Sequence, residues 1–210
     1  MQKIILIGDS GHSKVIEDCI YSNGDEVIAK LDDKYSERFM EGSLVKGPIS
    51  ILPELFSMDI KIFIAIGHNP TRKRIIDLLN LPSSIYATIV HKSAIIGSKV
   101  EIGFGTVVMP GVVVNADSQV GEHVILNSNS TIEHDCVVED FVHISPAVTL
   151  TGNVTVLEGT QIGAGSTVIP GQSIGSWSMI GAGSTIITEI PSNVTVVGVP
   201  AKVIKEEGQY

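Results

Sequence analysis

From about residue 90 onward, the hydrophobic positions of the chain recur every six residues. Counted from Ile96, the first position of each hexad is Ile, Val or Leu in all sixteen repeats up to Ile186, with no insertion. The fifth positions are mostly small or β-branched. The fourth positions are rich in residues that accept a left-handed backbone, and they include Gly105, Gly111, Asp117, Asn129, Asp135, Asn153, Gly159, Gly165, Gly171 and Gly183.

One short strand followed by one corner explains this six-residue unit. The first residue fills an interior, the small fifth residue fits beside it, and the fourth residue turns the corner. Three such units close a triangular coil of eighteen residues, and coils stack at the strand spacing of about 4.8 Å. An ordinary buried sheet would not hold this register for so long. We therefore predict a left-handed parallel β-helix over residues 89–192.

Residues 1–88 follow a different pattern, in which buried strands alternate with helices. We predict strands at 4–7, 26–31 and 60–66, with a helix after the first strand that ends near Asn23-Gly24. A short helix is expected at 48–56, and a longer one at 71–81 with its Arg and Lys on an open face. This order predicts a small parallel sheet in a Rossmann-like α/β domain. That domain is expected to cover one end of the β-helix, and the tail after Pro191 is expected to cover or flank the other. The tail is taken as residues 193–210.

Composition and charge exclude several classes of function. A net charge of −9 argues against a nucleic-acid partner, which requires clustered Lys and Arg, but not against a nucleotide held by backbone N–H groups. No apolar run is long enough to insert into a membrane, and no signal peptide is evident. Cys19 and Cys136 match no metal or redox spacing, so we expect two buried, reduced thiols in a cytoplasmic protein.

Several motifs give the chain a resemblance to the hexapeptide-repeat acyltransferases. It is most similar to the bacterial sugar O- or N-acyltransferases with an N-terminal Rossmann-like domain. These include UDP-4-amino-sugar N-acetyltransferases of the bacillosamine type and sialic acid O-acetyltransferases. The resemblance covers nearly the whole chain and rests on the segments 7–14 (IGDSGHSK), 31–33 (LDD), 65–67 (AIG), 90–94 (VHKSA), 126–128 (LNS), 132–136 (IEHDC) and 198–202 (GVPAK).

The resemblance implies a reaction and an assembly. The reaction is transfer of an acetyl group from acetyl-CoA, as co-substrate, to the 4-amino group of a UDP-linked amino-deoxy sugar in glycan biosynthesis. The assembly is a homotrimer with acetyl-CoA in the groove between neighbouring β-helices, and with the nucleotide sugar held mainly by the N-terminal domain. O-acetylation of sialic acid or of another sugar hydroxyl is the alternative within the same class.

Acetyl transfer needs a base, because the attacking amine or hydroxyl loses a proton as it attacks the thioester. Among six histidines, His134 is the candidate, because it occupies an outward third position and its family counterpart is the general base. A plain surface histidine remains the alternative. By the same resemblance Asp135 orients the base. Asn127 could polarise the nucleophile or stabilise the thioester carbonyl.

The resemblance also assigns His143, Ala164 and Ala182 to acetyl-CoA, and spacing adds Gly152. Gly152 is eighteen residues after His134 and should lie directly over it, leaving room for the pantetheine arm. His134 and His143 are nine residues apart, half of a coil, so they should face different sides of one β-helix. We therefore expect a productive site to combine His134 of one subunit with the His143 region of a neighbour.

The N-terminal candidates lie where strands end, the edge at which ligands gather in such sheets. Ser10, Gly11 and His12 form a strand-to-helix turn whose N–H groups suit an anion or a sugar hydroxyl. The turn is not GxGxxG, which argues against NAD. Asp32 and Asp33 follow the second strand and Gly67 follows the third. The resemblance implies that the aspartate pair binds the uracil or ribose.

Two functions from other classes remain open at this stage. A γ-type carbonic anhydrase would bind zinc through three histidines, but the spacing of His123, His134 and His143 does not place them on one face. We expect no metal. A non-catalytic β-helix, such as a scaffold, a ligand sensor or an ice-binding protein, is the other alternative.

Overall fold

The N-terminal part of the molecule is a five-stranded α/β sheet. The computed structural model describes residues 1–57 and 59–206. In the order β3-β4-β2-β1-β5, the sheet is parallel except for β3, which pairs antiparallel with β4. The strands are β1 (Lys3–Ile7), β2 (Glu26–Leu31), β3 (Phe39–Glu41), β4 (Leu44–Gly47) and β5 (Ile60–Ile64). The parallel sheet was predicted, whereas the short, largely exposed hairpin β3–β4 was not.

Helices cover both faces of this sheet, because the apolar side chains of β1 alternate between the two faces and each face must be buried. Ile4 and Leu6 pack in one cluster with α1 (Gly11–Ser22), and Ile5 and Ile7 pack in another with α3 (Asn69–Leu79). The predicted short helix is a 3-10 turn at Ile49–Ile51 that continues into α2 (Leu52–Leu55), and another 3-10 turn lies at Ser83–Ile85.

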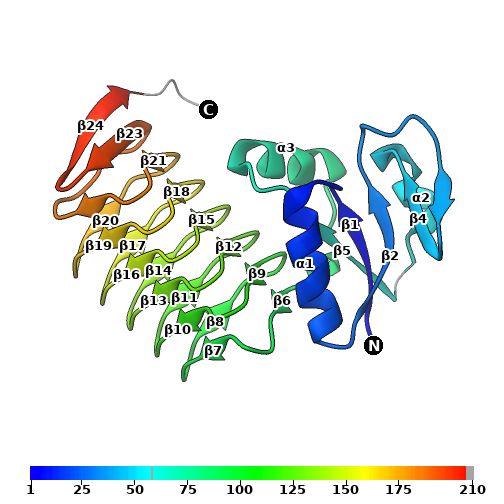
Figure 1. Ribbon diagram of the computed structural model, residues 1–210, viewed down its shortest axis with the longest axis horizontal. Helices are drawn as coiled ribbons and strands as arrows, with labels where there is room; N and C mark the ends of the chain where they lie inside the picture. The colour runs from blue at the N-terminus through cyan, green and yellow to red at the C-terminus, as the bar shows by residue number, and fades with distance from the viewer. Residues whose placement is uncertain (58, 207–210) are drawn as a thin grey trace.

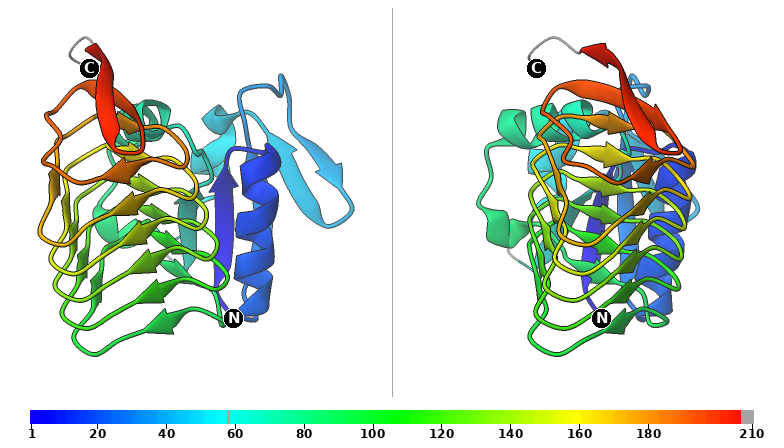
Figure 2. Two further views of the ribbon diagram at one scale, coloured as in Figure 1. Left: turned by 60° about the vertical axis from the view of Figure 1, so that its left-hand side comes forward. Right: turned by 90° about the vertical axis from the view of Figure 1, so that its left-hand side faces the viewer.

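Residues 89–186 form a prism of stacked triangular coils (Figure 2). Every parallel pair from β6 to β22 joins residues eighteen apart, such as Val113 with Thr131, which confirms the predicted β-helix. The strands are β6 (Ile89–Val90), β7 (Ile95–Ile96), β8 (Glu101–Ile102), β9 (Val107–Val108), β10 (Val113–Val114), β11 (Gln119–Val120), β12 (Ile125–Leu126), β13 (Thr131–Ile132), β14 (Val137–Val138), β15 (His143–Ile144), β16 (Thr149–Leu150), β17 (Thr155–Val156), β18 (Gln161–Ile162), β19 (Thr167–Val168), β20 (Ser173–Ile174), β21 (Met179–Ile180) and β22 (Thr185–Ile186).

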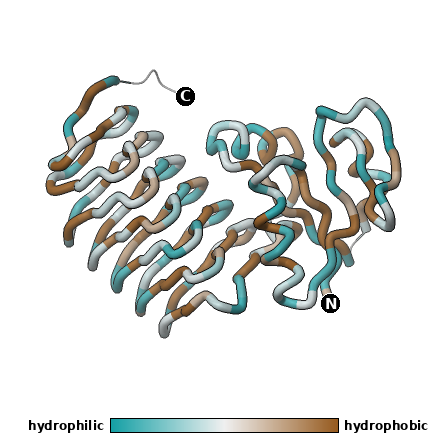
Figure 3. The backbone as a smooth tube through the Cα atoms, in the orientation of Figure 1, coloured by the Kyte–Doolittle hydropathy of each residue, from teal (hydrophilic) through white to brown (hydrophobic). Residues whose placement is uncertain are grey.

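The hexad positions have the predicted roles. The first positions are at most 4% exposed from Val108 to Ile186, so they form the interior of the prism. Figure 3 shows hydrophobic residues recurring along its coils. The fourth positions from Lys99 to Gly183 all have positive φ. This holds even for residues that rarely adopt it, namely His123, Phe141, Ala147 and Trp177.

The ends of the prism differ from each other. At the C-terminal end, β23 (Val194–Gly198) pairs parallel with β21, and β24 (Ala201–Glu206) folds back antiparallel on β23. The described part of the tail therefore extends a prism sheet. At the other end, the side chains of Ile95 and Ile96 remain 62% and 37% exposed.

The N-terminal domain does not cover that open end, so this expectation was wrong. It lies against the side of the prism (Figure 1). The reason is chemical: α3 carries Arg72 and Asn69, which bind main-chain carbonyls at His123, Phe141 and Gly159 along one corner. The boundaries at 88/89 and 192/193 remain the division that we propose.

Candidate active site

The strongest candidate for chemistry is the pair His134 and Asp135 at the corner between β13 and β14. The side chains are 63% and 61% exposed, and His134 Nδ1 lies 2.8 Å from Asp135 Oδ2. Asp135 has a φ of 60°, as the corner requires. The hydrogen bond to Asp135, followed by the negative charges of Asp135 and Glu133, raises the pKa of His134 despite slight desolvation. Because a carboxylate accepts from Nδ1–H, Nε2 of the neutral imidazole carries the free lone pair.

Gly152 lies directly over this imidazole, one coil further along, as its spacing predicts. A Cβ at position 152 would come within 2.7 Å of His134 Cε1 and Nε2. Only glycine therefore leaves the reactive nitrogen accessible from this side.

His143 lies in a different environment from the outward-facing one expected. It is 9% exposed beneath the N-terminal domain, and its ring centroid is 6.3 Å from that of His12. Asn127 Nδ2 donates to His143 Nε2 at 3.1 Å. Burial, and next the charge of Arg72, lower the pKa of His143 to about 3, so the ring is neutral at physiological pH.

The remaining prism candidates lie at a second corner. Asn127 follows β12, and its Oδ1 accepts from the N–H of Ser128. Ala164 and Ala182 are exposed on later coils of the same corner, where the N–H of Gly183 donates to the carbonyl of Ala164 at 2.8 Å. His134 and Gly152 thus share one corner, whereas Asn127, Ala164 and Ala182 share another. One chain does not bring these two groups together.

The turn after β1 brings its predicted residues to the edge of the sheet. Gly8 has a φ of 107°, and a Cβ there would lie 3.0 Å from the carbonyl oxygen of Ala65. Ser10 precedes α1 without a side-chain capping bond, and Gly11 is exposed. Gly67 faces the His12 ring, which a Cβ at position 67 would approach to 3.9 Å. Ser10, Gly11, His12 and Gly67 therefore lie around one end of the sheet.

The two aspartates after β2 order the neighbouring loops. Asp32 Oδ2 accepts from the N–H of Asp9 at 2.8 Å, and its Oδ1 accepts from the N–H of Lys34 at 3.0 Å. Asp33 Oδ1 accepts from the N–H of Ile49 at 3.0 Å. Contact of this pair with a uracil or ribose stays a prediction.

Sequence reasoning missed an ion-pair network beside this turn. Asp9 receives a hydrogen bond from Tyr35 at 2.6 Å and pairs with Lys46 at 3.1 Å and Lys30 at 3.7 Å. Burial would raise the pKa of Asp9, but the bonds from Tyr35 and Lys46 hold it below its ordinary value. An aspartate after a strand gives no signal of this network, because its lysines come from different strands.

Sequence reasoning also placed the arginines of the second long helix on an open face, and this was wrong for Arg72. Its side chain is among the largest that are fully buried, at 1% exposure. The signal that could have revealed it is weak: Asn69 and Arg72 are three residues apart and therefore share one face of the helix.

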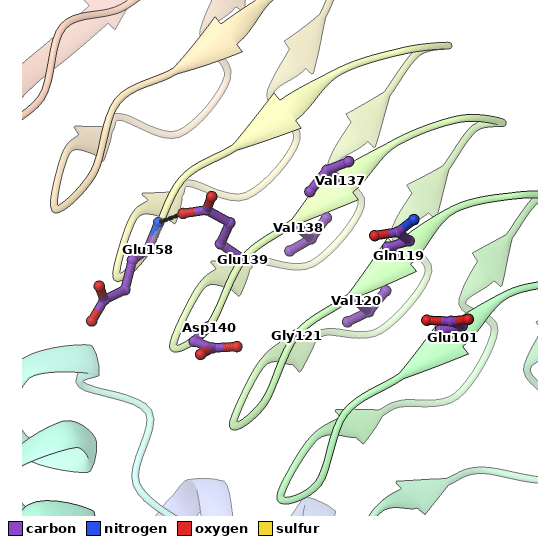
Figure 4. Close-up of a pocket in the computed structure, with 9 residues that line it drawn as sticks. All are labelled: Glu101, Gln119, Val120, Gly121, Val137, Val138, Glu139, Asp140 and Glu158. Atoms are coloured by element: carbon purple, nitrogen blue, oxygen red, sulfur yellow. Dashed lines mark hydrogen bonds between the residues drawn. The ribbon is translucent and has the colours of Figure 1, made fainter.

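Two grooves in the described part of the chain lie away from the candidate base. A groove of about 440 Å³ on the β-helix is lined by four acidic side chains, Glu101, Glu139, Asp140 and Glu158, together with Gln119, Val120, Gly121, Val137 and Val138 (Figure 4), and its carboxylates repel phosphates. A groove of about 920 Å³ lies between α2 and α3 and is largely apolar.

Residues 1–57 and 59–206 hold no group of three or more His, Cys, Asp or Glu side chains that could bind a metal ion. None of the helices in these residues is long and apolar enough to cross a membrane. Cys19 and Cys136 are buried and unbridged, as predicted.

Two family models match the chain, one in each part. The PglD N-terminal domain matches residues 3–79, and the bacterial transferase hexapeptide (six repeats) matches residues 99–134. A curated UDP-N-acetylbacillosamine N-acetyltransferase from Bacillus subtilis (strain 168) is 40% identical over 110 residues. That alignment covers 51% of this chain and 51% of the relative, so it spans about half of the relative's length.

Solved structures match over almost the full length. A mutant of perosamine N-acetyltransferase from Caulobacter crescentus, in complex with CoA and GDP-perosamine, is 32% identical with a TM-score of 0.89 and 98% coverage of both chains. The acetyltransferase domain of PglB from Neisseria gonorrhoeae FA1090 is 33% identical with a TM-score of 0.88, covering 97% of this chain and 100% of that one. By its two domains, its hexad register and these relatives, the chain belongs to the hexapeptide-repeat sugar N-acetyltransferases with a PglD-type N-terminal domain.

Proposed function

We propose that this protein transfers an acetyl group from acetyl-CoA to the 4-amino group of a UDP-linked amino-deoxy sugar. The observation that carries the proposal is the exposed His134, oriented by Asp135 and left accessible by Gly152. The relatives support it: one is named for a UDP-linked amino sugar, and another binds CoA and GDP-perosamine. Acetyl-CoA is made in the cytoplasm, where we place the reaction.

The chemistry follows from the tautomer of His134. Its Nε2 accepts a proton from the sugar amine as the amine nitrogen forms a bond to the thioester carbonyl carbon. Asp135 stabilises the imidazolium that results. The tetrahedral intermediate then expels the thiolate of CoA, which takes the proton from His134. The amide product and free CoA leave with His134 neutral again.

We propose that the site is completed by a neighbouring copy in a homotrimer. His134 lies at one corner of the prism, whereas Asn127 lies at another and His143 beneath the N-terminal domain. A second prism packed along the first would place His134 of one copy next to these residues of the other. The outward positions of the sheet between the two corners suit such packing, because Thr131, Thr149, Thr167 and Thr185 form a flat β-branched row.

Mixing two inactive variants tests the shared site. Copies with His134→Ala and copies with Asn127→Ala, co-expressed in equal amounts, should regain about one quarter of the wild-type sites if each site draws on two copies. No regain of activity in mixed trimers, measured by light scattering and thiol release, would place the whole site in one chain.

A thiol-release assay with acetyl-CoA tests the reaction itself. The acceptors are UDP- and GDP-linked 4-amino sugars, sialic acids and simple hydroxyl sugars. We expect turnover with an amino sugar, and His134→Ala should lower kcat by about two to four orders of magnitude. Turnover with sialic acid instead would establish the O-acetyltransferase, and unchanged turnover by His134→Ala would exclude His134 as the base.

A further inference from the structure

Arg72 uses all three guanidinium nitrogens as donors, and two of them bind across the contact between the domains. Its Nε donates to the carbonyl of His123 at 2.9 Å, and Nη2 donates to the carbonyl of Phe141 at 2.7 Å. These two carbonyls lie on neighbouring coils of the same corner. Nη1 donates in the opposite direction, to the carbonyls of Ile66 at 3.0 Å and Gly67 at 3.3 Å.

Asn69 extends this contact by one further coil. Its Nδ2 donates to the carbonyls of Gly159 at 3.0 Å and Thr160 at 3.3 Å, and its Oδ1 accepts from Arg72 Nη2 at 2.9 Å. Asn69 is 2% exposed and Arg72 is 1% exposed. Two buried polar side chains thus bind one column of corner carbonyls, at positions 123, 141 and 159.

The position of this column matters because Gly67 lies in the loop after β5, where it faces the His12 ring. The same guanidinium that binds Gly67 also binds the corner at Phe141, which leads directly into β15 and His143, and the neighbouring corner at His123. We propose that Arg72, supported by Asn69, is a positioning residue that holds the acceptor-binding edge of the N-terminal domain in register with the coil of His143. This inference rests on the proposed acetyl transfer.

The planar fork of arginine is needed for this geometry. Its donors point to both sides at once, whereas a lysine ammonium is a single point charge that cannot span the same set of carbonyls. We therefore expect Arg72→Met and Arg72→Lys to raise the KM for the acceptor and lower kcat, with kcat/KM reduced at least tenfold. The dissociation constant for CoA should stay within twofold of wild type, because the residues assigned to CoA, His143 among them, lie on prism coils that are held by their own backbone hydrogen bonds.

Arg74→Met is the matched control. Arg74 is exposed on the same helix and lines the apolar groove between α2 and α3, so its kcat/KM should stay within twofold of wild type. Wild-type kcat/KM in folded Arg72→Met would overturn the proposal, and full activity in Arg72→Lys would overturn the requirement for the fork. If Arg72→Met does not fold, Asn69→Ala, which removes only the contact with the third coil, must show the same raised acceptor KM for the proposal to stand.

A readout without chemistry separates this inference from the proposed function. Trp177 is the only tryptophan, and it lines a small hollow together with Asn69 and Pro70 at the start of α3. Its fluorescence should shift to longer wavelength in Arg72→Met and Asn69→Ala, but not in Arg74→Met, as the domains separate. A fluorescence shift in these variants, together with no acetyl transfer by the wild-type protein, would refute the proposed function but support the positioning role of Arg72. Unchanged fluorescence and unchanged kcat/KM in both Arg72→Met and Asn69→Ala would refute the positioning role of Arg72.

Discussion

At the scale of single residues, the role of His134 as a base depends on two neighbours, one that must contact the imidazole and one that must leave space beside it. Asp135 must reach the imidazole from a corner, and position 152 must leave the opposite side empty. The Asp135 carboxylate reaches Nδ1 of His134, at 2.8 Å, from a corner residue with a φ of 60°.

Asp135→Asn should move the pH profile of the reaction. His134 must be neutral to accept a proton, so activity rises as the pH increases through its pKa. Because Asp135 raises the pKa of His134, the variant should show this rise at lower pH, with the maximal rate reduced on the order of tenfold through loss of orientation. A pH series of kcat/KM measures both effects, and an unchanged profile would contradict the pairing.

Gly152→Ala should impair catalysis without unfolding the chain. Gly152 does not have positive φ, but the added methyl group would meet the imidazole at 2.7 Å and displace it from Asp135. We expect kcat to fall about tenfold or more. In the His134→Ala background the same substitution should add no further loss, because coupled residues are not additive; an equal loss in both backgrounds would mean that the methyl acts elsewhere.

At the scale of elements, the hexad register predicted the prism, and the alternation of strands and helices predicted the N-terminal parallel sheet. First and fourth positions identify interior and corner residue by residue, since each coil repeats the same steric problem. The hairpin β3–β4 and the burial of Arg72 and His143 lacked such a signal. They depend on contacts between segments far apart in sequence. The sequence around an isolated Arg or His does not indicate whether that residue lies on the surface or in a contact between domains.

The positive φ of the fourth hexad positions predicts opposite effects on stability for two substitutions. Gly171 has a φ of 73° and open space around its Cα, so Gly171→Ala should destabilise the fold by about 1 kcal/mol through backbone strain alone. Ala147 has a φ of 57°, so Ala147→Gly should relieve similar strain and be neutral to stabilising. Urea unfolding of both variants measures this, and destabilisation of the same size in both would contradict the rule.

At the scale of the whole molecule, the contact between the two domains is built from uncharged imidazoles around one buried cation. Burial, followed by the charge of Arg72, lowers the pKa of His12 and His123 to about 4, and His143 is lowered further. Burial lowers the pKa of Arg72 to about 9, so it remains charged at neutral pH.

This arrangement should make the fold sensitive to acid. The unfolded chain binds protons at these histidines near pH 6.5, whereas the folded chain does so only near pH 4 or below. Stability is therefore complete above pH 6.5 and falls as the pH drops toward 4, by up to about 1.4 kcal/mol per pH unit for each histidine. Urea unfolding from pH 7.5 to 4.5, followed by Trp177 fluorescence, measures the slope.

His123→Phe is the control for that assignment. The imidazole already stacks on Phe141 at 5.3 Å, so a phenyl ring keeps the packing and removes one titrating group. The slope should become shallower by roughly the contribution of one histidine. An unchanged slope would exclude His123 as a contributor to the acid sensitivity.

The uninterrupted offset of eighteen residues also limits how this molecule can change over evolution. A single-residue insertion within the prism would reverse the inside and outside of every later strand. Adding or removing a complete coil would leave each corner intact and shift the Ala164 and Ala182 column against His134 by one step of about 4.8 Å. The distance between a thioester and its acceptor can thus change only in steps of one complete coil.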